Sequence, residues 1–216
     1  MTMRLAVAIS GRGSNLAALL AALPAGGPAE VVLVLSNRAA AGLDLARARR
    51  IPTLVLPDPA DGRAWLDALA AHRVELIVLA GYLKLVPSPT VQQYRGRIIN
   101  IHPALLPAFG GPGMYGHRVH EAVLASGSAV SGATVHLVDE VYDRGAVLAQ
   151  ARVPVLPGDT PGTLAARVLE VEHRLLPRVV LELARRGLPG VPVRLFALGS
   201  TFVAGDQLGV DFEQGG

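Results

Sequence analysis

Three side chains that suit acid–base chemistry lie in two short stretches of the sequence. Asn100 and His102 stand two residues apart near the end of an apolar run, and Asp143 lies in the later stretch DEVYDRG. Residues two apart on a strand point to the same side of a sheet. An imidazole and an amide placed there can donate hydrogen bonds to an oxygen that gains negative charge, and a carboxylate favours the protonated imidazole. Taken singly, His102 also fits a structural histidine and Asp143 a turn residue.

A glycine-rich turn, SGRGSN at residues 10–15, separates the first apolar run from a helix-like segment. Glycines let the backbone turn tightly, and the free N–H groups at the start of a helix attract an anion. No lysine follows the glycines as in a Walker loop, and Leu16 stands where a dinucleotide-binding turn has its third glycine. The second strand ends in Ser36 and Asn37, not in an acid that could hold a ribose. The turn is therefore expected to bind a single phosphate, a plain strand–helix turn being the alternative.

The remaining histidines and the absent cysteines narrow the chemistry further. His117 and His120 have no clear carboxylate partner in the sequence around them, so no metal site is expected. His136 and His173 are expected to be structural or supporting residues. The chain has no cysteine, which excludes a disulfide framework, a thiolate zinc site and a cysteine nucleophile. It also lacks the GxSxG turn of serine hydrolases.

The composition indicates a folded chain with an aliphatic core. Of the 216 residues, 51% are hydrophobic, 17% charged and only 4% aromatic, which excludes a disordered chain. The net charge is +3, but the basic residues are scattered, so no nucleic-acid partner is expected. No apolar run approaches the ~18 to 20 residues of a membrane span, and the N-terminus shows no secretory pattern. We therefore expect a cytoplasmic protein without membrane contact.

Strand-like and helix-like segments alternate along the first half of the chain. Strands are expected at residues 5–9, 31–35, 53–56, 76–79, 97–101, 133–138 and 146–155. Helices are expected at residues 15–23, 39–49, 63–72, 119–126 and 163–186. This order predicts an α/β fold in which a Rossmann-like parallel sheet carries helices on both faces and is extended by an antiparallel C-terminal part.

Five segments together resemble the folate-dependent formyltransferase family. They are residues 10–15 (SGRGSN), 79–84 (LAGYLK), 100–107 (NIHPALLP), 132–136 (GATVH) and 143–145 (DRG). The similarity runs from about residue 5 to residue 177, and the string NIHPxLLP is specific to this family. The N-terminal SGxGSN string is similar to the branch whose formyl acceptor is glycinamide ribonucleotide (GAR), an intermediate of de novo purine synthesis.

The resemblance implies a site for two small substrates, GAR and 10-formyltetrahydrofolate, with no tightly bound cofactor. It implies catalytic roles for Asn100, His102 and Asp143. It implies contacts with GAR from Gly13, Ser14, Asn15 and Glu172. It implies a folate pocket formed by Arg63, Leu83, Lys84, Leu85, Val86, Asn100, Asp139, Glu140, Val141, Tyr142 and Asp143. The GAR amine would attack the formyl carbon while Asn100 and a protonated His102, kept charged by Asp143, stabilise the oxyanion.

On the same resemblance, one formyltransferase domain is expected over residues 1–190. Its phosphate-binding half is expected in residues 1–100, its folate-binding and catalytic half in residues 101–190, and a C-terminal extension in residues 191–216. The glycine-rich loop at residues 109–116 is expected to order over bound substrate. The protein is expected to be a monomer or a homodimer.

Three positions depart from the family pattern. Lys84 stands for a common arginine, Leu169 for a glutamine that contacts the ribonucleotide, and Arg144 for a glycine after the catalytic aspartate. The enzymatic alternatives are a formyltetrahydrofolate hydrolase and another formyltransferase, such as the methionyl-tRNA enzyme. The expected core begins near residue 5 and about forty residues follow Pro177, which disfavours the extra domains of both.

Two alternatives lie outside the formyl-transfer class. A non-catalytic nucleotide-binding module would explain the glycine-rich turn but not the trio of Asn100, His102 and Asp143. A dinucleotide-dependent oxidoreductase is disfavoured by Leu16 and by the end of the second strand.

Overall fold

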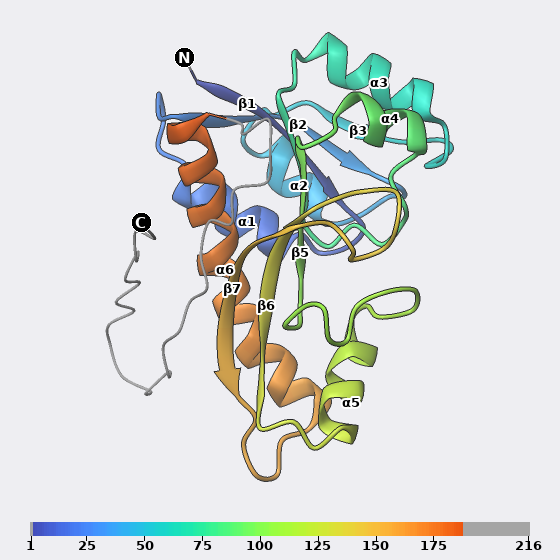
Figure 1. The fold of residues 1–216 in the computed structure, drawn as a ribbon. Coiled ribbons are helices and arrows are strands. Elements are labelled where there is room, and N and C mark those ends of the chain that lie inside the picture. Colours follow the sequence, from blue (N-terminus) through green and yellow to red (C-terminus); the bar gives the residue numbers. More distant parts are fainter. Residues whose placement is uncertain (1, 188–216) are drawn as a thin grey trace.

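The computed structural model describes residues 2–187 and is built around one seven-stranded sheet (Figure 1). The strands are β1 (Met3–Ile9), β2 (Ala29–Ser36), β3 (Thr53–Val55), β4 (Leu76–Leu79), β5 (Ile98–His102), β6 (Val130–Leu137) and β7 (Val147–Pro154). Their order across the sheet is β3-β2-β1-β4-β5-β6-β7. The first five strands are parallel, whereas β6 runs antiparallel to β5 and β7 antiparallel to β6. The predicted fold class is confirmed.

Helices cover both faces of the sheet. They are α1 (Ser14–Ala22), α2 (Gly42–Arg47), α3 (Gly62–Ala71), α4 (Ser88–Gln93), α5 (His117–Ala125) and α6 (Pro161–Arg186). Alternate residues of β1 show the two layers, since Leu5, Val7 and Ile9 join the core beneath α1 and α6. Ala6 and Ala8 join the core beneath α3 and α4 on the other face. The alternation follows from the two-residue period of a strand buried on both sides.

All the expected strands and helices are present, and the structure adds one short helix that was not expected. α4 spans Ser88–Gln93 and has Pro89 in its first turn, a favourable position for proline, but six residues are too few for a helical period to show in the sequence. α6 begins after Thr160, whose side chain forms a capping box with Thr163, and it continues through Pro177 to Arg186. The extension expected at residues 191–216 lies outside the described residues.

The sheet topology brings the chemically interesting segments to one edge. The glycine-rich turn follows β1, residues 80–86 follow β4, and His102 ends β5, so all three lie at the carboxyl ends of neighbouring parallel strands. Ligands bind at this edge in open α/β sheets. The antiparallel register then sets Asn100 opposite His136 and His102 opposite Thr134. Within residues 2–187, no helix is long and apolar enough to cross a membrane.

Candidate active site

A cavity of about 690 Å³ opens along this edge of the sheet. Six parts of the chain form its wall: the glycine-rich turn, the end of β4 with the segment after it, the end of β5, the start of α5 with the loop before it, the end of β6 with the loop after it, and the middle of α6. The residues that line it include Arg12, Ser14, Asn15, Tyr82, Leu83, Lys84, Leu85, Val86, Asn100, His102, Gly111, His117, His120, His136, Asp139, Val141, Tyr142, Asp143, Leu169 and Glu172. The cavity therefore joins residues that are far apart in the sequence.

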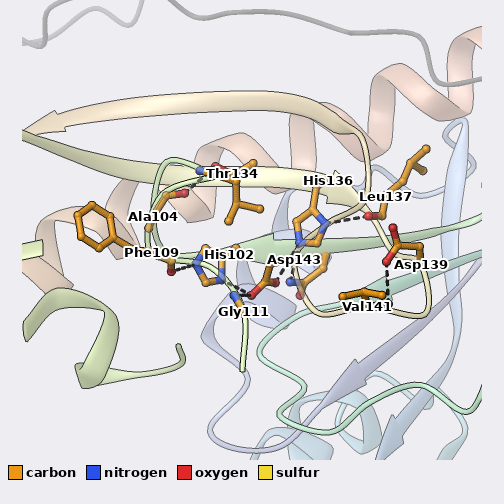
Figure 2. A network of polar contacts seen from close by, with 12 residues as sticks. His102, Ala104, Phe109, Gly111, Thr134, His136, Leu137, Asp139, Val141 and Asp143 are labelled. Carbon is orange, nitrogen blue, oxygen red and sulfur yellow. Dashed lines mark hydrogen bonds and ion pairs between the residues drawn. The ribbon is translucent and has the colours of Figure 1, made fainter. Parts of the chain in front are cut away.

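His102 lies at the centre of a polar network on the β5 side of the cavity (Figure 2). Its Nε2 lies 2.8 Å from the backbone oxygen of Phe109, which can only accept, so Nε2 carries a proton and donates it. Its Nδ1 lies 3.7 Å from Asp143 Oδ2. In the neutral ring Nδ1 is unprotonated, and any proton that it gains is placed beside the carboxylate.

Asp143 is held in place by the loops around it. The backbone N–H of Gly111 donates to Asp143 Oδ2 over 2.9 Å, and Oδ1 lies 3.5 Å from His136 Nε2. Its φ is 55°, in the left-handed region, where aspartate is more tolerated than most residues. Burial alone would raise the pKa of Asp143, but the contacts with His136, the Gly111 amide and His102 leave that pKa below its usual value. The carboxylate is therefore ionised at neutral pH.

Two opposing effects act on the protonation of His102, for which the sequence predicted an imidazole kept charged by Asp143. Burial lowers the pKa of His102, and it outweighs the opposing effects of Asp143 and of the Phe109 carbonyl. His136 nearby lowers it further. The imidazole is thus neutral at neutral pH before the reaction begins, with a basic nitrogen facing Asp143.

Asn100 is oriented by His136. The Nδ1 of His136 lies 2.8 Å from the backbone oxygen of Leu137 and donates to it. Nε2 of His136 lies 3.0 Å from Asn100 Nδ2 and accepts from it when it carries no proton. The amide nitrogen of Asn100 is thereby oriented by His136, and its second N–H has no partner among residues 2–187. The sequence indicated a supporting role for His136, but its partner became visible only through the strand register.

The opposite end of the cavity is formed by the glycine-rich turn and α6. Gly13 precedes α1 with φ 75°, and no side chain caps the first amides of the helix. Asn15 Nδ2 donates to Glu172 Oε2 over 2.6 Å, and this contact is buried. Asn15 Oδ1 is also buried and has no partner in the described part of the chain. Burial raises the pKa of Glu172 to about 7 despite the hydrogen bond from Asn15.

Most residues predicted for the folate pocket do line the cavity, but Arg63 and Glu140 do not. Leu83, Lys84, Leu85 and Val86 form one wall, and Asp139, Val141, Tyr142 and Asp143 form another. Arg63 lies on α3, its side chain is 90% exposed, and it pairs with Asp67 over 3.7 Å. Glu140 points toward α4, where Ser88 donates to it. For these two residues, contact with folate is not supported by their positions.

Two further histidines line the cavity beside the network. His120 is buried on α5, and burial, His117 and His102 lower its pKa to about 4. Its Nδ1 is buried and has no partner among the described residues. Residues 2–187 contain no group of three histidine, cysteine or acidic side chains arranged to hold a metal ion. His120 is thus a neutral polar group facing the space where a substrate would lie.

Residues 3–180 match the formyl transferase family, so the chain belongs to that family. The chain resembles the chloroplastic phosphoribosylglycinamide formyltransferase of Arabidopsis thaliana, at 47% identity over 186 residues that cover 82% of this chain and 64% of that protein. The phosphoribosylglycinamide formyltransferase of Mycobacterium tuberculosis is 43% identical over 191 residues, 86% of each chain.

A solved structure shows the same fold. The crystal structure of phosphoribosylglycinamide formyltransferase from Brucella melitensis superposes with a TM-score of 0.77 at 46% identity, over 85% of this chain and 96% of that one. The chain spans 64% and 65% of the lengths of the two plant relatives that it matches. The resemblance predicted from the five sequence segments is confirmed.

Proposed function

We propose that this chain transfers a formyl group from 10-formyltetrahydrofolate to the amine of GAR, giving formyl-GAR and tetrahydrofolate in purine synthesis. The observation that carries the proposal is the arrangement of one cavity. Asn100, His102 and Asp143 meet on one side of it, and an uncapped helix start lies at the other end. The relatives at 43% and 47% identity bear the name of this activity.

The glycine-rich turn is suited to the phosphate of GAR. Gly13 turns the chain so that the first N–H groups of α1 are available, and the helix dipole adds positive potential there. Ser14 and Arg12 line the same part of the cavity. The unpartnered Asn15 Oδ1 and the carboxyl of Glu172 are acceptors for hydroxyl groups next to that phosphate. Leu169 lines this end as well and offers no hydrogen bond.

The walls formed by residues 82–86 and 138–143 are suited to the folate donor. Leu83, Leu85, Val141 and Tyr142 are exposed apolar or aromatic residues that face the cavity. A flat ring system inserted between these walls would bury them. Lys84 lines the same space and supplies a positive charge for a carboxylate of the donor. Asn100 lines the same cavity as the residues suited to either substrate.

The protonation states of Asn100, His102 and Asp143 indicate the order of the chemical steps. The GAR amine attacks the formyl carbon, and the free N–H of Asn100 donates to the oxygen that becomes negative. The attacking nitrogen passes a proton to Nδ1 of His102, which becomes a cation beside Asp143. The tetrahedral intermediate then expels the folate nitrogen N10, which takes up that proton. The formyl C–N bond to GAR has formed, the bond to N10 has broken, and no net proton is consumed.

Holding both substrates in one cavity supplies a large part of the rate enhancement, because a two-body encounter becomes a step within one complex. No covalent enzyme intermediate is required. We further propose that the protein acts in the cytoplasm without a nucleic-acid or membrane partner. Its state as a monomer or homodimer stays a prediction, as does ordering of loop 109–116 over substrate.

The proposal is tested by a formyl-transfer assay. The protein is mixed with GAR and a 10-formyl folate whose deformylated product absorbs differently, and the absorbance change is followed with and without GAR. The expected result is turnover that requires GAR and is lost in His102→Ala. Folate release that does not require GAR would instead indicate a hydrolase. A folded protein that shows no turnover of the folate donor, with or without GAR, would overturn the proposal.

A further inference from the structure

Glu140 faces away from the cavity and binds α4. Its Oε1 accepts a hydrogen bond of 2.7 Å from Ser88 Oγ and one of 2.9 Å from Gln92 Nε2. Ser88 and Gln92 lie one helical turn apart, and Gln92 also donates to Ser88 over 3.1 Å. These hydrogen bonds hold the pKa of Glu140 below its usual value, so the carboxylate is ionised at neutral pH. Two side chains of α4 thus converge on one charged oxygen of Glu140.

This contact connects the two walls that form the proposed folate pocket. Glu140 belongs to the loop at residues 138–143. The next two residues of this loop, Val141 and Tyr142, line the cavity. α4 follows directly on the opposite wall, since Leu85 and Val86 line the cavity and Pro87 is the cap of the helix. A change in the distance between Glu140 and α4 would therefore change the distance between the walls.

The rest of the loop is fixed by contacts that do not cross the pocket. Asp139 Oδ1 accepts from the backbone N–H of Val141 over 2.8 Å, which closes a local turn and directs Glu140 outward. Asp143 is anchored to Gly111 in the loop before α5. Of these three anchors, the Glu140 contact is the one that reaches the segment carrying the other folate wall.

We propose that Glu140 is a positioning residue that sets the separation of the two folate walls and so the affinity for the folate donor, without touching the donor itself. The proposal rests on the proposed function. It replaces the direct folate contact expected of Glu140 from the sequence. Because the hydrogen bonds are solvent-exposed, their loss is expected to weaken donor binding moderately, by about fivefold.

Kinetics at saturating GAR with varied folate donor test the role. Glu140→Ala is expected to raise KM for the donor about fivefold while kcat and KM for GAR stay within about twofold. Glu140→Gln keeps an oxygen that accepts from Ser88 and Gln92, so it is expected to restore most of the affinity. Removing the donors instead, in Ser88→Ala/Gln92→Ala, is expected to raise KM as much as Glu140→Ala does. The triple variant should show no further rise.

Glu30→Ala is the matched control, because it removes an exposed carboxylate that pairs with Arg4 at the amino ends of β1 and β2, and neither residue lines the cavity. Binding of the donor without GAR is read from the fluorescence of Trp65, whose ring lies 5.5 Å from that of the cavity residue Tyr82. An unchanged donor KM in both Glu140→Ala and the Ser88/Gln92 variant would overturn the proposal, as would an equal rise for both substrates. A wild-type protein that binds no folate and transfers no formyl group would instead refute the proposed function.

Discussion

The two ends of the cavity are built from different kinds of group. At the α1 end the main features are the uncapped backbone N–H groups that follow Gly13, together with one buried pair of side chains, Asn15 and Glu172. At the β5 end the features are side chains that contact one another, with His102 and Asp143 as the central pair. Backbone amides recognise charge whatever the side chains are, whereas a side-chain network depends on each member. The first end is therefore suited to holding an anion and the second to moving protons.

Burial shifts the pKa values of the titratable groups at the two ends in opposite directions. Burial raises the pKa of Glu172 to about 7, and it lowers the pKa of His102 below its usual value. In both cases the low-dielectric surroundings favour the neutral form. The β5 end differs because it also contains Asp143, whose hydrogen bonds keep it charged. An ion is thus fixed where the proposed proton transfer takes place, and a neutral carboxyl is favoured where a ribonucleotide would be bound.

The largest effect is expected from removing that fixed ion. Asp143→Asn keeps the size of the side chain but cannot balance a proton on Nδ1 of His102, so kcat is expected to fall by at least ~100-fold. The charge of Asp143 raises the pKa of His102, and its loss therefore lowers that pKa further. The proposed mechanism needs neutral His102, so wild-type kcat should fall as the pH drops through the lowered pKa of His102, below the ordinary imidazole value of ~6.5. In Asp143→Asn this fall should move to lower pH.

The pH dependence of kcat provides the check, with KM for both substrates measured at each pH. A wild-type rate that instead falls as the pH rises through the His102 pKa would favour the protonated donor that the sequence had suggested. A fall that moves to higher pH in Asp143→Asn would contradict the assigned effect of the carboxylate.

Glu172→Gln tests the opposite end through stability. The unfolded chain ionises this carboxyl near pH 4.5, but the folded chain does so at about 7, so wild-type stability is lost as the pH rises between these values. Glutamine does not ionise. Between pH 4.5 and 7.5 the free energy of unfolding of the variant, relative to wild type, is therefore expected to increase by about 3 kcal/mol. Urea denaturation at several pH values measures it, and parallel curves for the two proteins would contradict it.

Gly13→Ala tests the backbone at the same end. Gly13 has φ 75°, and a Cβ there would lie 3.0 Å from Gly42 Cα, so alanine is expected to cost about 2 kcal/mol of stability and to raise KM for GAR. Gly11 is the matched control in the same turn. A Cβ at Gly11 meets nothing within 4 Å, so Gly11→Ala should change stability by less than ~0.5 kcal/mol. Equal losses in the two variants, measured by urea denaturation, would show that the turn conformation is not the reason.

The sequence was sufficient for the fold and for the residues that approach one another through local rules. The alternation of apolar runs and helices predicted the sheet, and the spacing of Asn100 and His102 placed both at the end of β5. Contacts that depend on long-range pairing were not predictable. The contact of His136 with Asn100 follows from the antiparallel register of β5 and β6, and the partners of Glu140 lie on α4, a helix that the sequence did not predict. Burial, which sets the protonation of His102, is also a property of the assembled fold.

The smallest effect is expected from His136, which acts on the substrates only through Asn100. His136→Gln can present an amide oxygen near the position of Nε2, so Asn100 Nδ2 keeps an acceptor and kcat should stay near that of wild type. His136→Asn is too short to reach Asn100, which frees the amide to rotate, and kcat is expected to fall about tenfold with KM unchanged. In an Asn100→Ala background the two His136 variants should then have equal kcat, because the group they orient is missing. A tenfold difference that persists in that background would mean that His136 acts through Asp143 instead, whose Oδ1 lies 3.5 Å from Nε2.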